Sequence, residues 1–191
     1  MTLGETMKRT SIPFPILVAS LLALAAATPV AASDDGFRPL PRDGVEQQSY
    51  QRSRSLAVSL VREAQPTLGL GHRRLADQVI RELARVRFLA SASAGSRQLC
   101  RDRRYSLFVR ASRPNVIHVC DEVRPHARSA DADAIARLAQ AFVHEAVHLA
   151  GDLDECAAMD FELAVMRRTI GIRTQGSQIS YGARCGRMGA R

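Results

Sequence analysis

Four stretches of the chain carry apolar residues at the spacing of three and four positions that is typical of amphipathic helices. Two of them lie in the N-terminal half: a helix is predicted from Val45 to Ala64, Pro66 to Gly71 break it, and a second helix follows. The second helix is expected to run into a strand around Val86 to Ala90. The apolar positions that define these two helices are Leu56, Val58, Leu60, Val61, Leu75, Val79, Ile80, Leu83 and Val86.

A β-hairpin is predicted in the middle of the chain. Two short runs rich in β-branched and aromatic residues, Tyr105 to Val109 and Val116 to Cys120, flank the turn-forming sequence Arg113 to Asn115. The segments on either side, Ser91 to Arg104 and Asp121 to Ala130, are predicted to be loops. A hairpin among helices indicates the α+β fold class.

The other two amphipathic stretches predict a pair of helices with a short connection. The first is apolar on two sides, which is typical of a buried helix, and Ser129 or Asp131 is available as its N-cap. Gly151 is suited to end it, because glycine readily adopts positive φ. Asp152 or Asp154 can then cap the second helix. The apolar positions are Ile135, Leu138, Ala139, Phe142, Val143, Val147 and Leu149 in the first helix, and Cys156, Met159, Leu163, Met166 and Ile170 in the second.

Two histidines lie one turn apart on the first of these helices, at His144 and His148. Residues four apart share a helix face, so both imidazoles can reach one metal ion. Glu145 lies roughly 100° further around the axis, where it can act as a general base on metal-activated water but is poorly placed to bind the metal. The alternative is two surface histidines and a solvated glutamate. The apolar surroundings favour a metal site, because burying these groups without partners costs free energy.

The pattern H-E-x-x-H at His144 to His148 is a signature of zincin metallopeptidases, and a catalytic zinc takes three protein ligands. The run from His144 to Asp154 also fits H-E-x-x-H-x-x-G-x-x-D, which resembles one branch of the metzincins, with Asp154 as third ligand. The helix that follows at once looks more like a compact gluzincin, in which a glutamate on a second helix completes the site. It is also similar to small secreted bacterial zincins. Because Asp154 is suited to cap that helix, Glu155 is favoured as the third ligand.

This resemblance implies a minimal zincin-like domain, in which a small β-hairpin or sheet packs on the active-site helix and a ligand-bearing helix follows. It implies a Zn²⁺-dependent hydrolase that cleaves peptide bonds, with Glu145 as general base. In zincins an edge strand aligns the peptide substrate, and Val116 to Cys120 is expected to take that place, with Tyr105 to Val109 as the alternative.

Three further residues are candidates for catalytic contacts under the same resemblance. His118 would lie near the cleft, although a structural role is favoured because alternation along a strand often places a histidine outward. Tyr181 and Arg184 are possible donors to the oxyanion.

Residues 1–33 have the pattern of a secretory signal peptide. Lys8 and Arg9 precede an apolar run from Ile12 to Ala27, and small residues at positions 30–32 offer a cleavage site. The run contains prolines and is a poor membrane span, so no transmembrane segment is expected after cleavage. Residues 34–191 are expected to form a single domain, secreted or periplasmic, with a disordered lead from Ser33 to Arg42.

The four cysteines predict two disulfide bonds in an exported protein. Of the three possible pairings, Cys100–Cys120 and Cys156–Cys185 are favoured because they close the shorter loops. In the alternative, Cys120 or Cys156 is a zinc ligand, as peptide deformylases combine a cysteine with this histidine motif. Thiolates in oxidising compartments are usually paired, which disfavours the alternative.

The net charge of +8 predicts attraction to anionic surfaces such as those of a cell envelope. Lysine occurs once, at Lys8, so the other basic residues are arginines, and they are scattered along the chain. With no tryptophan and few other aromatic residues, the chain offers little base stacking, and nucleic acid is not an expected partner.

The sequence therefore predicts an exported zinc metallopeptidase that acts on peptides or proteins. A zinc amidohydrolase with another substrate would use the same residues. The rival hypotheses are a non-catalytic, zincin-like metal-binding scaffold that docks its basic surface on the envelope, and a disulfide-stapled interaction domain in which the motif is incidental.

Overall fold

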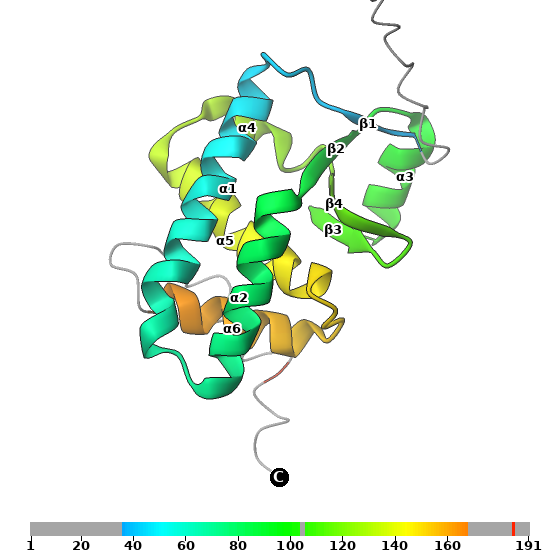
Figure 1. The fold of residues 1–191 in the computed structure, drawn as a ribbon. Coiled ribbons are helices and arrows are strands. Elements are labelled where there is room, and N and C mark those ends of the chain that lie inside the picture. The colour runs from blue at the N-terminus through cyan, green and yellow to red at the C-terminus, as the bar shows by residue number, and fades with distance from the viewer. Residues whose placement is uncertain (1–35, 104–105, 168–184, 186–191) are drawn as a thin grey trace, which may run out of the picture. The chain divides into compact units, whose positions relative to one another are not determined.

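The computed structural model describes residues 36–103, 106–167 and Cys185, and these residues form an α+β fold (Figure 1). The fold class is therefore as predicted, whereas the predicted signal peptide, residues 1–33, lies outside the described residues. In chain order the elements are β1 (Phe37–Pro39), α1 (Val45–Ala64), the short 3₁₀ helix η1 (Gln65–Thr67), α2 (Leu70–Arg85), β2 (Arg87–Ser91), α3 (Ala94–Arg103), β3 (Leu107–Arg110), β4 (Arg113–Val119), α4 (Arg124–Ser129), α5 (Ala132–Leu149) and α6 (Glu155–Met166).

The strands form one mixed sheet in the order β1-β2-β4-β3. β2 and β4 run parallel in the centre, and β1 and β3 pair antiparallel to them at the two edges. The prediction that Val116 to Cys120 forms an edge strand is wrong, because residues 116–119 belong to β4, which β2 and β3 flank. The edge on that side is β3, which holds most of the alternative segment, Tyr105 to Val109.

Alternating side chains of the sheet belong to two separate hydrophobic cores. Phe88, Ile117 and Val119 join the larger core, which is built with the helices. Leu89 and Val116 point to the other face and join a smaller core that includes Cys100 of α3. Figure 1 shows α3 on one side of the sheet and α1, α2 and α5 on the other. The sheet thus separates α3 from α5.

α5 lies at the centre of the helical layer, where it packs against α1, α2, α4, α6 and β3. Its alanines Ala139 and Ala146 are fully buried, and small side chains at contact positions let helix axes approach closely. Phe142 anchors the helix on the sheet, with its ring centroid 4.8 Å from that of Phe88. The His144 side chain remains partly exposed, at 16 %.

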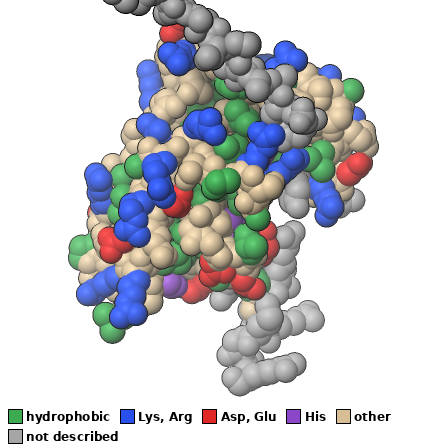
Figure 2. All heavy atoms as spheres, turned by 45° about the vertical axis from the view of Figure 1, so that its right-hand side comes forward, with side chains coloured by type: hydrophobic (Ala, Val, Ile, Leu, Met, Phe, Trp, Pro, Cys, Tyr) green, Lys and Arg blue, Asp and Glu red, His purple; other side chains and the backbone are tan. Residues whose placement is uncertain are grey.

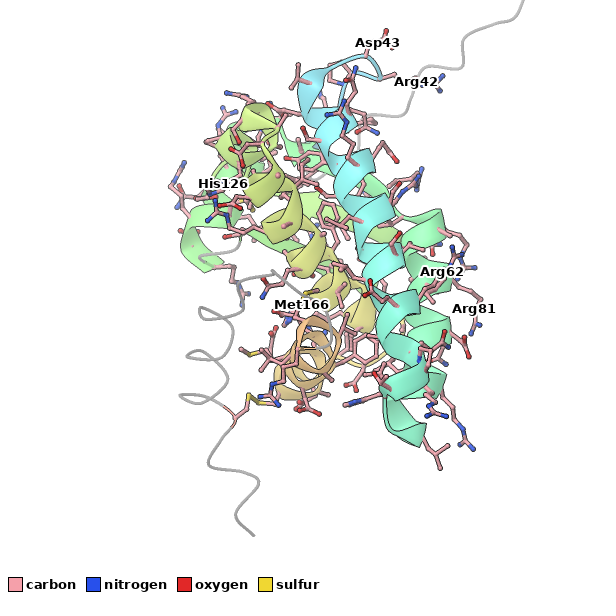
Figure 3. All side chains as sticks on the ribbon, turned by 90° about the vertical axis from the view of Figure 1, so that its left-hand side faces the viewer. Arg42, Asp43, Arg62, Arg81, His126 and Met166 are labelled. Carbon is pink, nitrogen blue, oxygen red and sulfur yellow. A yellow bond between two sulfur atoms is a disulfide. The ribbon has the colours of Figure 1, made fainter. Side chains whose placement is uncertain are left out.

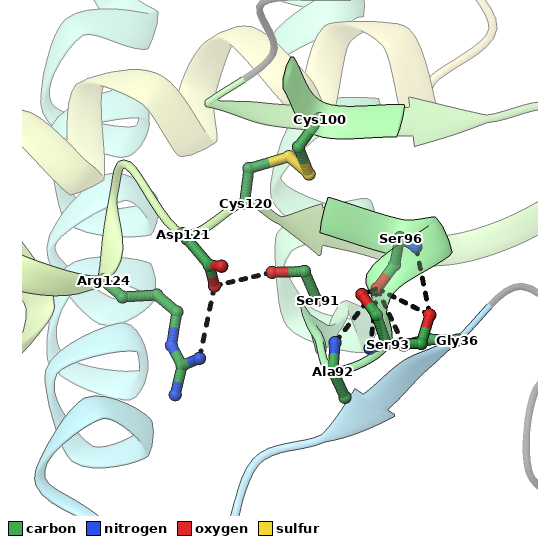
Figure 4. Close-up of a disulfide and its surroundings, with 9 residues drawn as sticks. All are labelled: Gly36, Ser91, Ala92, Ser93, Ser96, Cys100, Cys120, Asp121 and Arg124. Carbon is green, nitrogen blue, oxygen red and sulfur yellow. Dashed lines mark hydrogen bonds and ion pairs between the residues drawn. A yellow bond between two sulfur atoms is a disulfide. The ribbon is translucent and has the colours of Figure 1, made fainter. Parts of the chain in front are cut away.

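The segment from Ser91 to Arg104 contains α3 and is not the predicted polar loop. The Ser93 hydroxyl oxygen accepts a hydrogen bond from the backbone N–H of Ser96 (3.1 Å) and so satisfies the start of the helix (Figure 4). A disulfide then ties Cys100 of α3 to Cys120 beyond β4. α3 has no long apolar stripe, and a cap and a disulfide hold it instead. Hydrophobic periodicity therefore could not predict this helix.

The N-terminal lead from Ser33 to Arg42 also contains an element that was not predicted, the strand β1. Phe37 is buried, and the carbonyl oxygen of Gly36 accepts a hydrogen bond from the Ser96 hydroxyl (3.0 Å). Gly36 has a φ of 74°, and a Cβ atom there would lie 1.8 Å from the Ser93 hydroxyl oxygen. Only glycine fits this junction without strain.

Two more local predictions are corrected. Arg113 to Asn115 were predicted as a turn but belong to β4, although Asn115 keeps a turn-like φ of 61°. The predicted loop from Asp121 to Ala130 contains the six-residue helix α4. Arg124 of this helix donates hydrogen bonds to Glu46 of α1 (2.9 and 3.2 Å), a contact between distant parts of the sequence.

Both predicted disulfide bonds are present, Cys100–Cys120 and Cys156–Cys185. Paired cysteines are typical of proteins in oxidising compartments, which agrees with the predicted export. None of the described helices combines the length and the apolar character that crossing a bilayer requires.

Candidate metal centre

The connection between α5 and α6 is a tight turn of the predicted kind. Gly151 has a φ of 101° and donates its N–H to the carbonyl oxygen of His148 (3.1 Å), which ends α5. Asp154 is the N-cap of α6, and its side chain accepts a hydrogen bond from the N–H of Ala157 (2.8 Å). Glu155 is therefore the first residue of α6 and lies opposite the last turns of α5.

This turn brings His144, His148 and Glu155 together. One oxygen of the Glu155 carboxylate lies 3.2 Å from Nε2 of His144, and the other lies 3.6 Å from Nε2 of His148. One ligand atom from each of the three residues lies within 4.8 Å of the other two. Tetrahedral zinc with bonds of roughly 2.0–2.2 Å separates its ligand atoms by about 3.4 Å, so the three groups have the spacing of a metal site.

The burial of His148 provides a separate test of the fit. Its side chain is 8 % exposed, and its buried Nε2 atom has no hydrogen-bond partner among the described residues. An unsatisfied buried polar atom is costly. A metal ion between His148, His144 and Glu155 would satisfy this atom, so the donor set fits a divalent cation such as zinc.

The second nitrogen of each imidazole, Nδ1, lies within hydrogen-bond distance of an oxygen atom. Nδ1 of His148 lies 2.8 Å from the backbone carbonyl oxygen of Asp152, and Nδ1 of His144 lies 3.1 Å from a carboxylate oxygen of Glu162. Carbonyl and carboxylate oxygens only accept, so with a cation at Nε2 each Nδ1 keeps its proton and donates it. Both Nε2 atoms are thereby turned toward Glu155, which is the arrangement usual for metal-binding histidines.

Glu162 was not predicted as part of the site. It is 4 % exposed on α6, and the Gln140 side-chain amide donates to its other carboxylate oxygen (2.5 Å). The available signal was a single carboxylate among the apolar positions of the second helix. Its distance of 18 residues from His144 hid the contact, because only the fold of α6 against α5 brings the two together.

Glu145 occupies the next position on α5 and is 8 % exposed. Burial raises the pKa of its carboxyl group to about 7; the charges of Glu155 and Glu162 also raise it, while His144 lowers it. Burial lowers the pKa of His144, but its hydrogen bond to Glu162 and the nearby carboxylates outweigh this and raise it. A carboxylate with a pKa near 7 is suited to act as a general base near neutral pH.

The other predicted site residues lie elsewhere. Asp154 uses its side chain to cap α6 and is not in the group of three ligands. His118 is fully buried on β4, where its ring stacks on Phe108 of the smaller core (centroids 4.7 Å apart) and lies on the sheet face that points away from α5. Tyr181 and Arg184 lie outside the described residues.

The turn between α5 and α6 is rich in acidic side chains. Figure 2 shows blue basic side chains spread over most of that face, while red acidic ones gather toward its lower end, near a visible histidine. The loop that follows α5 contributes Asp152 and Asp154, and Glu155 is 63 % exposed. Three acidic residues thus lie within four positions at the turn that carries a candidate ligand, and their negative charge favours a cation there.

No family model, no curated protein and no solved structure matches the chain. The assignment of the site therefore depends on the residues and their geometry.

Proposed function

We propose that the protein is an exported, zinc-dependent metallopeptidase of the H-E-x-x-H type with a compact, gluzincin-like arrangement of ligands. The observation that carries the proposal is the convergence of His144, His148 and Glu155, in which the buried Nε2 of His148 finds no hydrogen-bond partner within the part of the chain that the structure describes. Its zincin-like character is inferred from this ligand set and from the order of the helix with the two histidines and the helix with the glutamate.

The chemistry follows from the side chains around the metal. Zinc bound by the three residues would supply a Lewis acid and lower the pKa of water toward about 7. Glu145 accepts the proton of the attacking water and later transfers it to the leaving amine. Its burial beside His144 keeps bulk water away from this proton transfer.

β3 is the proposed strand for aligning the substrate. It is the edge strand next to β4, and it packs against α5. An extended peptide can add to such an edge through backbone hydrogen bonds, which gives affinity without requiring one particular sequence. This proposal replaces β4, which has neighbours on both sides.

A non-catalytic metal-binding scaffold is the second candidate, and the exposed basic surface favours it. Arg62 of α1 and Arg81 of α2 are exposed, and both lie at the outer side of these helices (Figure 3). Together with the net charge of +8, they favour docking on an anionic envelope. This candidate predicts bound zinc without hydrolysis of any peptide.

The test begins with metal content, measured by elemental mass spectrometry on protein purified from an oxidising compartment without a histidine tag. We expect about one zinc per chain, in line with a single three-ligand site, and loss of it in the double variant His144→Ala/His148→Ala. A peptide-library screen of the zinc-loaded protein then separates a peptidase from a scaffold. A protein that takes up no metal even after reconstitution with zinc contradicts both candidates.

A further inference from the structure

Glu162 is a buried carboxylate with a restricted set of neighbours. It is 4 % exposed in the middle of α6 and surrounded along that helix by the buried residues Phe161 and Leu163. A carboxylate in such surroundings is costly unless its oxygens are paired. Its two oxygens are paired with Gln140 and His144, both on α5.

The two contacts use different oxygens of the Glu162 carboxylate. Gln140 lies one turn before His144 on α5, and its amide donates to Oε1 of Glu162 (2.5 Å). This leaves Oε2 facing Nδ1 of His144 at 3.1 Å. The Gln140 bond therefore fixes the carboxylate in the orientation that receives the imidazole proton.

We propose that Glu162 is a positioning residue for the metal centre: by accepting the Nδ1 proton of His144, it holds the imidazole in the tautomer whose Nε2 lone pair faces Glu155 and His148. This inference rests on the proposed function, since it assigns the residue a role toward the same metal. α6 then supplies both a ligand, at its first residue, and the support of another ligand, two turns later.

Without Glu162, the tautomer balance of the neutral His144 imidazole would shift toward the form protonated on Nε2. Nδ1 would face no acceptor from α6, while the Glu155 carboxylate, 3.2 Å from Nε2, would still accept a proton held there. The proton would move to Nε2, the atom that must be free of it to bind a metal. Loss of the acceptor thus opposes metal binding directly.

Two substitutions separate this role from simple packing. Glu162→Leu removes the acceptor and keeps an apolar side chain of similar length in a buried position. Glu162→Gln removes the charge but keeps an amide oxygen for Nδ1, because the Gln140 amide can turn to present its own oxygen to the new NH₂ group. Asp160→Asn is the matched control, since Asp160 lies on the same helix but pairs with His72 (3.2 Å).

The first readout is the tautomer of His144, measured by ¹⁵N NMR on the metal-free protein at a pH where the imidazole is neutral. We expect the fraction of His144 protonated on Nδ1 to be similar in the wild type, in Glu162→Gln and in Asp160→Asn, and to fall in Glu162→Leu in favour of the form protonated on Nε2. The second readout is the dissociation constant for zinc, measured by competition with a chelator. We expect it to rise by about 10- to 100-fold in Glu162→Leu, by less in Glu162→Gln, and not at all in Asp160→Asn.

The outcomes distinguish this inference from the proposed function. If Glu162→Leu folds, as judged by thermal unfolding, and keeps both the wild-type tautomer and the wild-type zinc affinity, Glu162 does not position His144. If the wild type binds no zinc, the proposed function fails. The tautomer shift in Glu162→Leu then still decides whether Glu162 orients the imidazole.

Discussion

At the scale of single residues, the candidate site divides its tasks among neighbouring positions. Asp154 and Glu155 are adjacent carboxylates, yet the first caps α6 and the second faces the histidines. Glu145 and His144 are also adjacent, yet His144 contacts Glu155 as a candidate ligand, whereas Glu145 is 8 % exposed and is the proposed general base. Each role depends on where the helix begins and on which side of the helix the residue lies. A single substitution can therefore test each role.

Glu145→Gln should separate metal binding from catalysis. The amide is nearly the same size but cannot accept the proton, and general-base catalysis contributes about 10²- to 10⁴-fold. We expect zinc content to stay at the wild-type level, while the turnover number on an established peptide substrate falls by at least about 100-fold. Full activity in this variant would show that another group accepts the proton.

Glu155→Gln and Asp154→Asn form a matched pair for the third ligand. Asn caps a helix about as well as Asp, so Asp154→Asn should leave both α6 and zinc affinity nearly unchanged. Glu155→Gln should weaken zinc binding by at least about 10-fold, since it replaces an anionic ligand by a neutral one. Isothermal titration with zinc measures both, and the opposite ranking would transfer the ligand role to Asp154.

At the scale of elements, the sequence predicted those that bury an apolar stripe and missed those held by other means. Periodic apolar positions made four helices predictable, namely α1, α2, α5 and α6. α3 depends on the Ser93 cap and the Cys100 disulfide, and β1 depends on pairing with β2, far along the chain. The ligands His144, His148 and Glu155 lie within 12 residues and were predictable from local spacing. Glu162 was not, because its contact needs the packing of two helices.

α4 is a further element held by polar contacts, and its contact with α1 should make stability depend on pH. Burial raises the pKa of the Glu46 carboxyl, but the hydrogen bonds and charges of Arg124 and Arg128 outweigh it and hold the pKa below its ordinary value. Because the folded-state pKa is lowered, this stabilisation is complete above the unfolded-state pKa and is lost as the pH falls through the folded-state value. Glu46→Gln should reduce the free energy of unfolding at pH 7 by about 1.5–3 kcal/mol.

Urea unfolding at several pH values measures this effect. The difference between wild type and Glu46→Gln should shrink toward zero in acid, below the ordinary pKa of glutamate. Glu63→Gln is the control, because Glu63 is exposed near the other end of α1 and should show little change. A difference that stays constant from neutral to strongly acidic pH would mean that the Glu46 charge is not responsible.

At the scale of the whole molecule, the two disulfides join different parts of the structure. Cys100–Cys120 connects α3 to the end of β4 in the smaller core, on the sheet face away from α5. Cys156–Cys185 holds a C-terminal residue against the first turn of α6, directly after Glu155. The bonds enclose comparable lengths of chain, with sequence separations of 20 and 29. They differ mainly in their distance from the candidate ligands.

Removing each bond should therefore have a shared effect and a separate one. Cys100→Ser/Cys120→Ser and Cys156→Ser/Cys185→Ser should each lower the free energy of unfolding by about 2–4 kcal/mol, since loops of this size restrict the unfolded chain to a similar extent. Zinc affinity should fall only in the second variant, because there the first turn of α6, which carries Glu155, loses its covalent anchor. Thermal unfolding of the metal-free variants and zinc titration at a temperature where both are folded measure the two effects. Equal zinc affinity in the two variants would show that the Asp154 cap and the packing of α6 suffice to hold Glu155, and that the second disulfide serves stability alone.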